Sequence, residues 1–117
     1  RLSDSYDDFL HLVLAHPDLK PCSRGPTPDL DEERRGRMRT LFELLVSLFE
    51  RAYRLAYEDD MNVRQARRWR SWEDYMREWC RRGDFRQALL QLVHGEDPDF
   101  VAYLPRLVEK EVRHPPA

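Results

Sequence analysis

The most constraining feature of this sequence is the segment from residue 29 to residue 59, which is apolar over more than half of a helix circumference. Its central stripe repeats at steps of three and four residues and comprises Met38, Leu41, Phe42, Leu45, Phe49, Ala52, Tyr53 and Ala56. Further apolar side chains widen the stripe, namely Leu44, Leu48 and Leu55 on one side and Val46 and Tyr57 on the other. A surface helix needs a narrower apolar band. We therefore predict one long central helix that several neighbours contact.

Four shorter helices are expected around this central one. The same periodicity places them at residues 3–16, 63–82, 85–94 and 98–112. No segment shows the two-residue alternation of a β-strand over more than a few residues, and 117 residues suit a single domain. The sequence therefore predicts an all-α fold, a compact bundle of about five helices that spans residues 1–117. Because the chain starts with Arg1 and not with Met, we also expect it to be a piece of a longer protein.

Capping residues predict where the helices begin and end. The long helix has two competing starts, because Thr27 can cap it ahead of Pro28, or Asp29 can pair with Glu32. Pro105 stands inside the last helix, where it predicts a kink or a break. The other expected caps are Asn62, Gly83, Asp84 and Asp97. A connector rich in proline, residues 17–28, is expected to be irregular.

The helix expected at residues 63–82 separates aromatic from basic side chains. On a helical wheel Trp69, Trp72 and Trp79 share one side, which we predict to face the core. The opposite side carries the candidate surface for an anionic partner, made of Arg64, Arg67, Arg70, Arg77 and Arg81, together with Arg82. Residues 64–86 hold eight arginines against four acids. We interpret this side as a solvated or ion-paired face, and binding to nucleic acid, an anionic lipid headgroup or an acidic protein is the alternative.

The width of the apolar arc on the central helix raises the question of self-association. If four neighbouring helices cannot cover it, apolar side chains remain for a second subunit. The candidates for such an interface are Leu44, Leu48 and Leu55.

No pattern in the sequence points to a metal, a cofactor or a catalytic group. The four histidines form no His-x-x-x-His or Glu-x-x-His spacing, and the four glycines are isolated, so that no phosphate-binding loop is present. Cys80 falls on the tryptophan side, where a small core residue is expected. We therefore predict no cofactor and no catalytic residue, and an enzyme with a site assembled from scattered residues is the remaining enzymatic alternative.

Three segments and one short motif resemble a family of bacterial proteins. They are FELLVSLFERAYRLAYED at 42–59, WRSWEDYMREWCRRGDFRQALLQ at 69–91, DPDFVAYL at 97–104, and His16-Pro17-Asp18-Leu19. These segments look like the soluble helical domain of bacterial proteins of unknown function that carry N-terminal transmembrane helices. The resemblance implies a cytoplasmic helical module tethered to the inner membrane, and it assigns no site residues. The present sequence has no such transmembrane span.

Taken together, these patterns favour a non-enzymatic helical interaction or sensory module. Its expected partner is another protein, a copy of itself or an adjacent domain. The alternative is a small nucleic-acid or anionic-lipid binding domain that uses the arginine side of residues 63–82. The net charge of −2 argues against a polycation built to hold nucleic acid.

Overall fold

The computed structural model describes residues 2–19, 30–92 and 97–113, in which the regular secondary structure is helical and no β-strand occurs. The elements are α1 (Leu2–Leu14), the 3₁₀ turn η1 (Pro17–Leu19), α2 (Glu32–Ala56), α3 (Val63–Trp79), α4 (Gly83–Leu92) and α5 (Pro98–Arg113). The predicted all-α bundle is confirmed.

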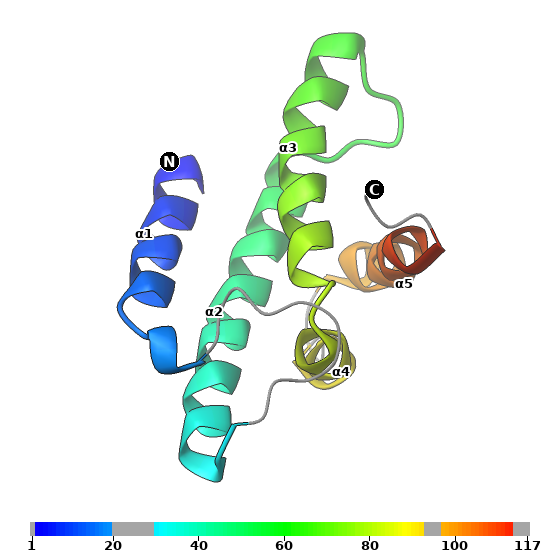
Figure 1. Ribbon diagram of the computed structural model, residues 1–117. Helices are drawn as coiled ribbons and strands as arrows, with labels where there is room; N and C mark the ends of the chain where they lie inside the picture. Colours follow the sequence, from blue (N-terminus) through cyan, green and yellow to red (C-terminus); the bar gives the residue numbers. More distant parts are fainter. Residues whose placement is uncertain (1, 20–29, 93–96, 114–117) are drawn as a thin grey trace.

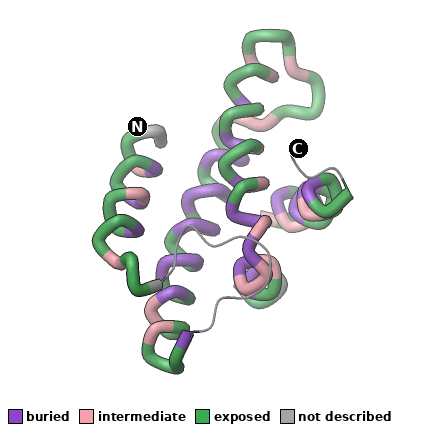
Figure 2. Tube along the Cα trace, in the orientation of Figure 1, coloured by how far each residue is buried: buried purple, intermediate pink, exposed green. Residues whose placement is uncertain are grey.

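Helix α2 is the centre of the bundle, as its wide apolar arc predicts. It contacts α1, η1, α3, α4 and α5, and Figure 1 shows α1 and α3 on either side of it. Buried positions follow α2 through most of its length in Figure 2. Leu45 and Ala52, in the middle of the stripe, have no exposed surface. The hydrophobic core is therefore built around this one helix.

Helix α2 is shorter at each end than the predicted span of residues 29–59. Its N-cap is Asp31, whose side chain accepts a hydrogen bond of 2.8 Å from the backbone N–H of Arg34. The expected caps Thr27 and Asp29 lie outside the described residues. Asp31 caps the helix because its backbone is extended directly before the first turn, and its side chain accepts a hydrogen bond from a backbone N–H of that turn. At the other end the helix stops at Ala56, since Tyr57 is extended.

The junction between α3 and α4 corrects three predictions. Asn62 caps α3 as expected, with the reciprocal bonds of a capping box to Gln65. However, α3 ends at Trp79 with Cys80 as its C-cap, so that Gly83 is not a left-handed cap but the first residue of α4. Asp84 is not the N-cap of α4, because its carboxylate instead accepts two hydrogen bonds from Arg82, at 2.9 and 2.8 Å.

Helix α5 begins where the Asp97-Pro98 pair predicts. The Asp97 carboxylate accepts hydrogen bonds from the backbone N–H groups of Asp99 and Phe100, at 2.9 and 3.2 Å. Pro105 does not divide the helix, which runs unbroken from Pro98 to Arg113. Proline has no backbone N–H, so the carbonyl group four residues before Pro105 loses its usual helical hydrogen bond. Because Pro105 is exposed, this carbonyl group can bond to water instead.

The tryptophan side of α3 faces the core, as predicted. Trp69, Trp72 and Trp79 are 3%, 9% and 7% exposed. The indole N–H of Trp79 donates to the hydroxyl of Tyr6 in α1, and that of Trp69 donates to Tyr103 in α5, both at 3.3 Å. Aromatic side chains of α3 therefore bind α1 and α5 to the centre of the bundle.

Candidate functional site

The N-terminal half of α3 carries the only part of the predicted arginine surface that remains available among the described residues. Arg64, Arg67 and Arg70 are exposed, as is their neighbour Arg68, which the wheel analysis leaves out. None of these four has an ion pair or a hydrogen bond to its side chain in the described part of the chain. We call these four residues the arginine face.

Two other predicted members of this surface, Arg77 and Arg81, contact an acidic side chain within the protein. Arg77 and Arg81 are partly buried, and both contact the buried carboxylate of Glu111 in α5. Arg81 Nε donates to Glu111 Oε1 at 3.2 Å, and Arg77 Nη2 lies 3.5 Å from Glu111 Oε2. The prediction that Arg77 and Arg81 form one outward face with Arg64 is wrong. Helix α5 packs against α3 and covers these two arginines, and its Glu111 contacts both of them.

Arg82 was expected on the outward side, and that expectation is wrong. Its side chain is 2% exposed, its guanidinium lies 5.6 Å from the centre of the Phe42 ring, and it pairs with Asp84. Helical-wheel geometry does not apply to Arg82, because α3 has already ended at Trp79. Arg82 is therefore part of the α3–α4 junction.

A polar seam between α3 and α5 was not anticipated from the sequence. Tyr103 accepts a hydrogen bond from Trp69 and donates one of 3.0 Å to Glu73, whose other oxygen accepts a bond of 2.6 Å from Lys110. Burial, with the Glu73 carboxylate beside it, raises the pKa of Tyr103 above its usual value. This phenol therefore stays protonated near neutral pH, and its two hydrogen bonds join α5 to α3.

The candidate apolar interface on α2 is not contiguous. Leu44 and Leu55 are 50% and 76% exposed, but Leu48 is 3% exposed and belongs to the core. The prediction that Leu48 is left for a second subunit is wrong, because a helical wheel cannot tell which positions a neighbouring helix such as α1 covers. Leu44 and Leu55 stand about 16 Å apart along the helix axis, with the buried Leu48 between them. They do not form one patch.

Cys80 lies in the core, as expected. It is 1% exposed, and burial raises the pKa of its thiol to about 12. Within residues 2–19, 30–92 and 97–113, no three or more His, Cys, Asp or Glu side chains are placed to hold a metal ion. The prediction that the protein uses no cofactor stays a prediction.

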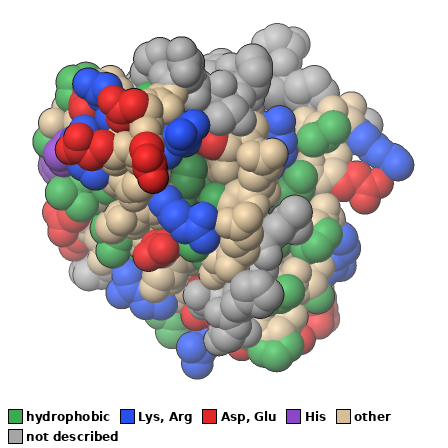
Figure 3. Space-filling view, turned by 90° about the horizontal axis from the view of Figure 1, so that it is seen from below, with side chains coloured by type: hydrophobic (Ala, Val, Ile, Leu, Met, Phe, Trp, Pro, Cys, Tyr) green, Lys and Arg blue, Asp and Glu red, His purple; other side chains and the backbone are tan. Residues whose placement is uncertain are grey.

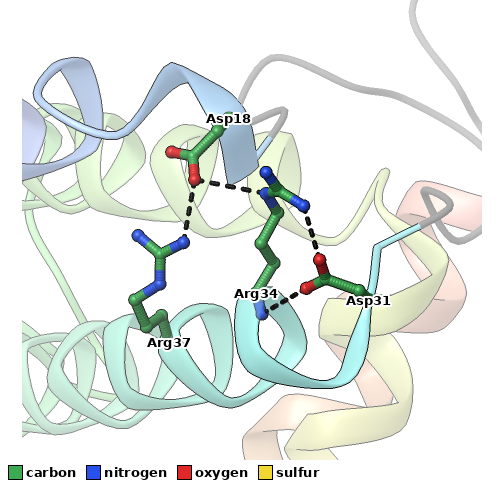
Figure 4. Close-up of polar contacts among 4 residues, drawn as sticks. All are labelled: Asp18, Asp31, Arg34 and Arg37. Carbon is green, nitrogen blue, oxygen red and sulfur yellow. Dashed lines mark hydrogen bonds and ion pairs between the residues drawn. The ribbon is translucent and has the colours of Figure 1, made fainter.

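Charges of both signs alternate at the end of the molecule where α2 begins. Figure 3 views this end and shows acidic and basic side chains interspersed. Here Asp18 of η1 accepts hydrogen bonds from Arg37 at 2.9 Å and from Arg34 at 3.3 Å, and Arg34 also binds Asp31 (Figure 4). The bond from Arg37 is the main reason that the pKa of Asp18 lies below its usual value. These arginines are therefore engaged in joining η1 to α2.

Comparison with known proteins adds no relative: no protein-family model, no curated protein and no solved structure matches this chain. In the part of the chain that the structure describes, no helix combines the length and the apolar character needed to cross a bilayer.

Proposed function

We propose that this domain is a non-enzymatic interaction module that binds an acidic segment of a partner protein through the arginine face. The observation that carries the proposal is the exposure of Arg64, Arg67, Arg68 and Arg70, with no ion pair or hydrogen bond to their side chains in the described residues. Residues 61–72 contain no acidic side chain. Four unneutralised guanidinium groups repel one another, and carboxylates of a partner relieve that repulsion through bidentate pairs.

The position of the arginine face supports a role in binding. The N-terminal half of α3 reaches one extremity of the molecule, away from α4, in Figure 1. Val63, directly before Arg64, is 77% exposed and offers an apolar contact beside the charges. A protein partner uses both kinds of contact.

A protein partner is favoured over a nucleic acid by the orientation of the indole rings. Single strands are held by basic grooves combined with aromatic side chains on which bases stack. Trp69, which lies between Arg68 and Arg70, and Trp72, which follows them, are both buried in the core. The arginine face therefore supplies charge without a stacking surface.

The test is binding of a fluorescently labelled oligoglutamate peptide at low salt, measured by fluorescence anisotropy. The double variant Arg67→Gln with Arg70→Gln is expected to weaken binding about tenfold, since each charge pair contributes up to ~1 kcal/mol. The matched control removes two exposed arginines of α2, Arg35 and Arg51, and should change affinity by about twofold or less.

Two results would refute the proposal. One is equal loss of affinity in the two double variants, which would mean that net charge alone attracts the peptide. The other is tighter binding of single-stranded DNA or of phosphatidylserine vesicles than of the peptide, lost in the variant of Arg67 and Arg70. That result would replace the protein partner by a nucleic acid or a lipid surface.

The sequence resemblance adds a location to this proposal. We infer that the module acts on the cytoplasmic side of a bacterial inner membrane, tethered by a segment outside this sequence. Membrane fractionation of cells that express the full-length protein tests the tether, and recovery of all the protein in the unsedimented fraction would argue against it.

A further inference from the structure

The outer side of α3 carries charges of opposite sign in its two halves. Its N-terminal half presents the arginine face, and its C-terminal half presents Asp74 and Glu78. Both acids are exposed, and neither has an ion pair or a hydrogen bond to its side chain among the described residues. In Figure 1 α3 lies in front of α2, and none of the described helices lies over this outer side. Within the described part of the chain, this surface is therefore open along its length.

Like charges crowd each half of this surface in the isolated protein. Arg64 and Arg68 are four residues apart on the helix, and so are Asp74 and Glu78. Side chains at this spacing are neighbours, and a pair of like charges there destabilises a helix. Each half therefore favours a partner of the opposite charge. The other half of α3 has that charge, but along one helix Arg64 and Glu78 lie ~21 Å apart.

The charges on this side are arranged symmetrically about Ser71, which is itself exposed. Arg64 precedes Ser71 by seven residues and Glu78 follows it by seven, whereas Arg67 precedes it by four and Asp74 follows it by three. On a helical wheel these four residues lie within about 60° of Ser71. A two-fold axis at Ser71 pairs the first half of one helix with the second half of an antiparallel copy. Each of these arginines then faces an acid.

The geometry of such a pair of helices matches the side chains closely. With the axis at Ser71, Arg67 of one copy and Asp74 of the other lie on the same side of the contact, offset by about 1.5 Å along the helix. Arg64 of one copy lies at the level of Glu78 of the other. Because the two-fold axis repeats both contacts, the pair of helices has four ion pairs.

Two uncharged residues also suit this contact. Ser71, at the centre, has a small side chain, so the two helix axes can approach to ~8 Å. Tyr75 is 37% exposed, and its ring is held by stacking on Tyr6, with the ring centres 4.3 Å apart. It follows Ser71 by four residues, so Arg68 of the second copy lies beside it and can place its guanidinium on the ring.

We propose that the acidic segment bound by the arginine face is the C-terminal half of α3 in a second copy of this chain. The protein then forms a symmetric dimer through two antiparallel α3 helices. This inference rests on the proposed function, whose partner it names. The contact involves one helix from each copy and is mainly charged, so the dimer is weak, reversible and sensitive to salt.

The test is sedimentation velocity at low salt, over a range of micromolar to millimolar protein concentrations. The mass of the parent protein should rise from that of the monomer toward that of a dimer, and high salt should reverse this rise. Asp74→Arg combined with Glu78→Arg should weaken association about a hundredfold, because four attractive pairs become repulsive. Arg64→Glu combined with Arg67→Glu should have the same effect.

An equimolar mixture of these two charge-reversed variants should associate again, because each arginine in the mixed dimer faces an acid. The matched control is Glu43→Arg combined with Glu109→Arg, on α2 and α5. These two acids are exposed, and their replacement changes the net charge as much as the first variant does. The control should associate as tightly as the parent protein, within about twofold.

A disulfide between copies tests the position of the two-fold axis. In a Cys22→Ser background, where Cys80 is buried, Ser71→Cys should form a cross-linked dimer on mild oxidation, since the two sulfur atoms meet at the axis. Val112→Cys, at a position of α5 that is 62% exposed, should remain a monomer under the same conditions.

The proposal is overturned if the parent protein stays a monomer at millimolar concentration and low salt. It is also overturned if the charge-reversed variants, with a helical circular dichroism spectrum, associate as tightly as the parent, or if their mixture associates no more tightly than each alone. The variant of Asp74 and Glu78 keeps the arginine face and should still bind oligoglutamate. A monomeric parent that binds oligoglutamate would refute only the dimer and assign the acidic segment to a different protein. Absence of oligoglutamate binding in that variant would refute the proposed function itself.

Discussion

Replacement of Glu111 by glutamine tests whether a buried charge holds α5 against α3. Glu111 is 4% exposed and contacts both Arg77 and Arg81, at 3.5 and 3.2 Å. Glutamine preserves the shape and one acceptor oxygen, but it removes the negative charge that the two guanidinium groups face. The variant therefore isolates the charge from the packing.

The expected loss of stability depends on how far Arg77 and Arg81 are exposed to water. A hydrogen bond to a charged group contributes ~1.5–3 kcal/mol, and breaking a fully buried ion pair costs ~3–5 kcal/mol. The side chains of Arg77 and Arg81 are 19% and 25% exposed, so water can solvate them after the change. We expect the free energy of unfolding to fall by about 2 kcal/mol. With an unfolding entropy of ~2.1 cal/mol/K per residue, Tm falls by about 8 °C.

The matched control is Glu109→Gln on the same helix. Glu109 pairs with Arg113 at 3.0 Å, but the two side chains are 56% and 71% exposed. An exposed pair of this kind contributes ~0.3–0.5 kcal/mol, so Tm should fall by about 2 °C or less. Urea titration and thermal unfolding, followed by circular dichroism, measure both variants. Equal midpoints for Glu111→Gln and Glu109→Gln would refute the reasoning.

Two further predictions concern Gly36 and Cys80. Gly36 lies inside α2, and a Cβ atom there would meet nothing within 4 Å, so Gly36→Ala should raise the free energy of unfolding by ~1 kcal/mol; a lower urea midpoint would contradict this. Cys80 keeps its proton in the folded state up to a pKa of about 12, whereas the unfolded thiol ionises near 9.0, so stability should fall between these pH values. Cys22 is the other cysteine of the sequence, so a Cys22→Ser variant leaves Cys80 as the single thiol. In that variant the Cys80 thiol should react with a disulfide reagent at mildly alkaline pH only after unfolding, and rapid reaction of the native protein would disprove its burial.

The helices could be predicted because their signals are local. The central stripe of α2 and the tryptophan side of α3 follow from apolar spacing along a few turns. Asn62 and Asp97 cap helices as predicted, because a cap bonds to amides two or three residues away. The start of α2 was missed because several neighbouring acids are competent caps, and the sequence does not show that Asp31 is the one before the first helical turn.

The positions of the polar groups could not be predicted in the same way. Arg77 and Arg67 lie on the same side of a helical wheel, but Glu111 of α5, more than thirty residues later in the sequence than Arg77, contacts Arg77 and not Arg67. Leu48 is buried and Leu44 exposed for a similar reason, since neighbouring helices cover part of the wide arc.

Periodicity and caps are therefore sufficient to establish the all-α class, the central helix and its inward aromatic side, because each depends on residues within a few turns of one another. The free arginine face and the ion pairs of Glu111 with Arg77 and Arg81 depend instead on which segments pack together. The packing of the helices brings some charged side chains into ion pairs and leaves others without a partner. The contacts that decide this form between residues that are far apart in the sequence.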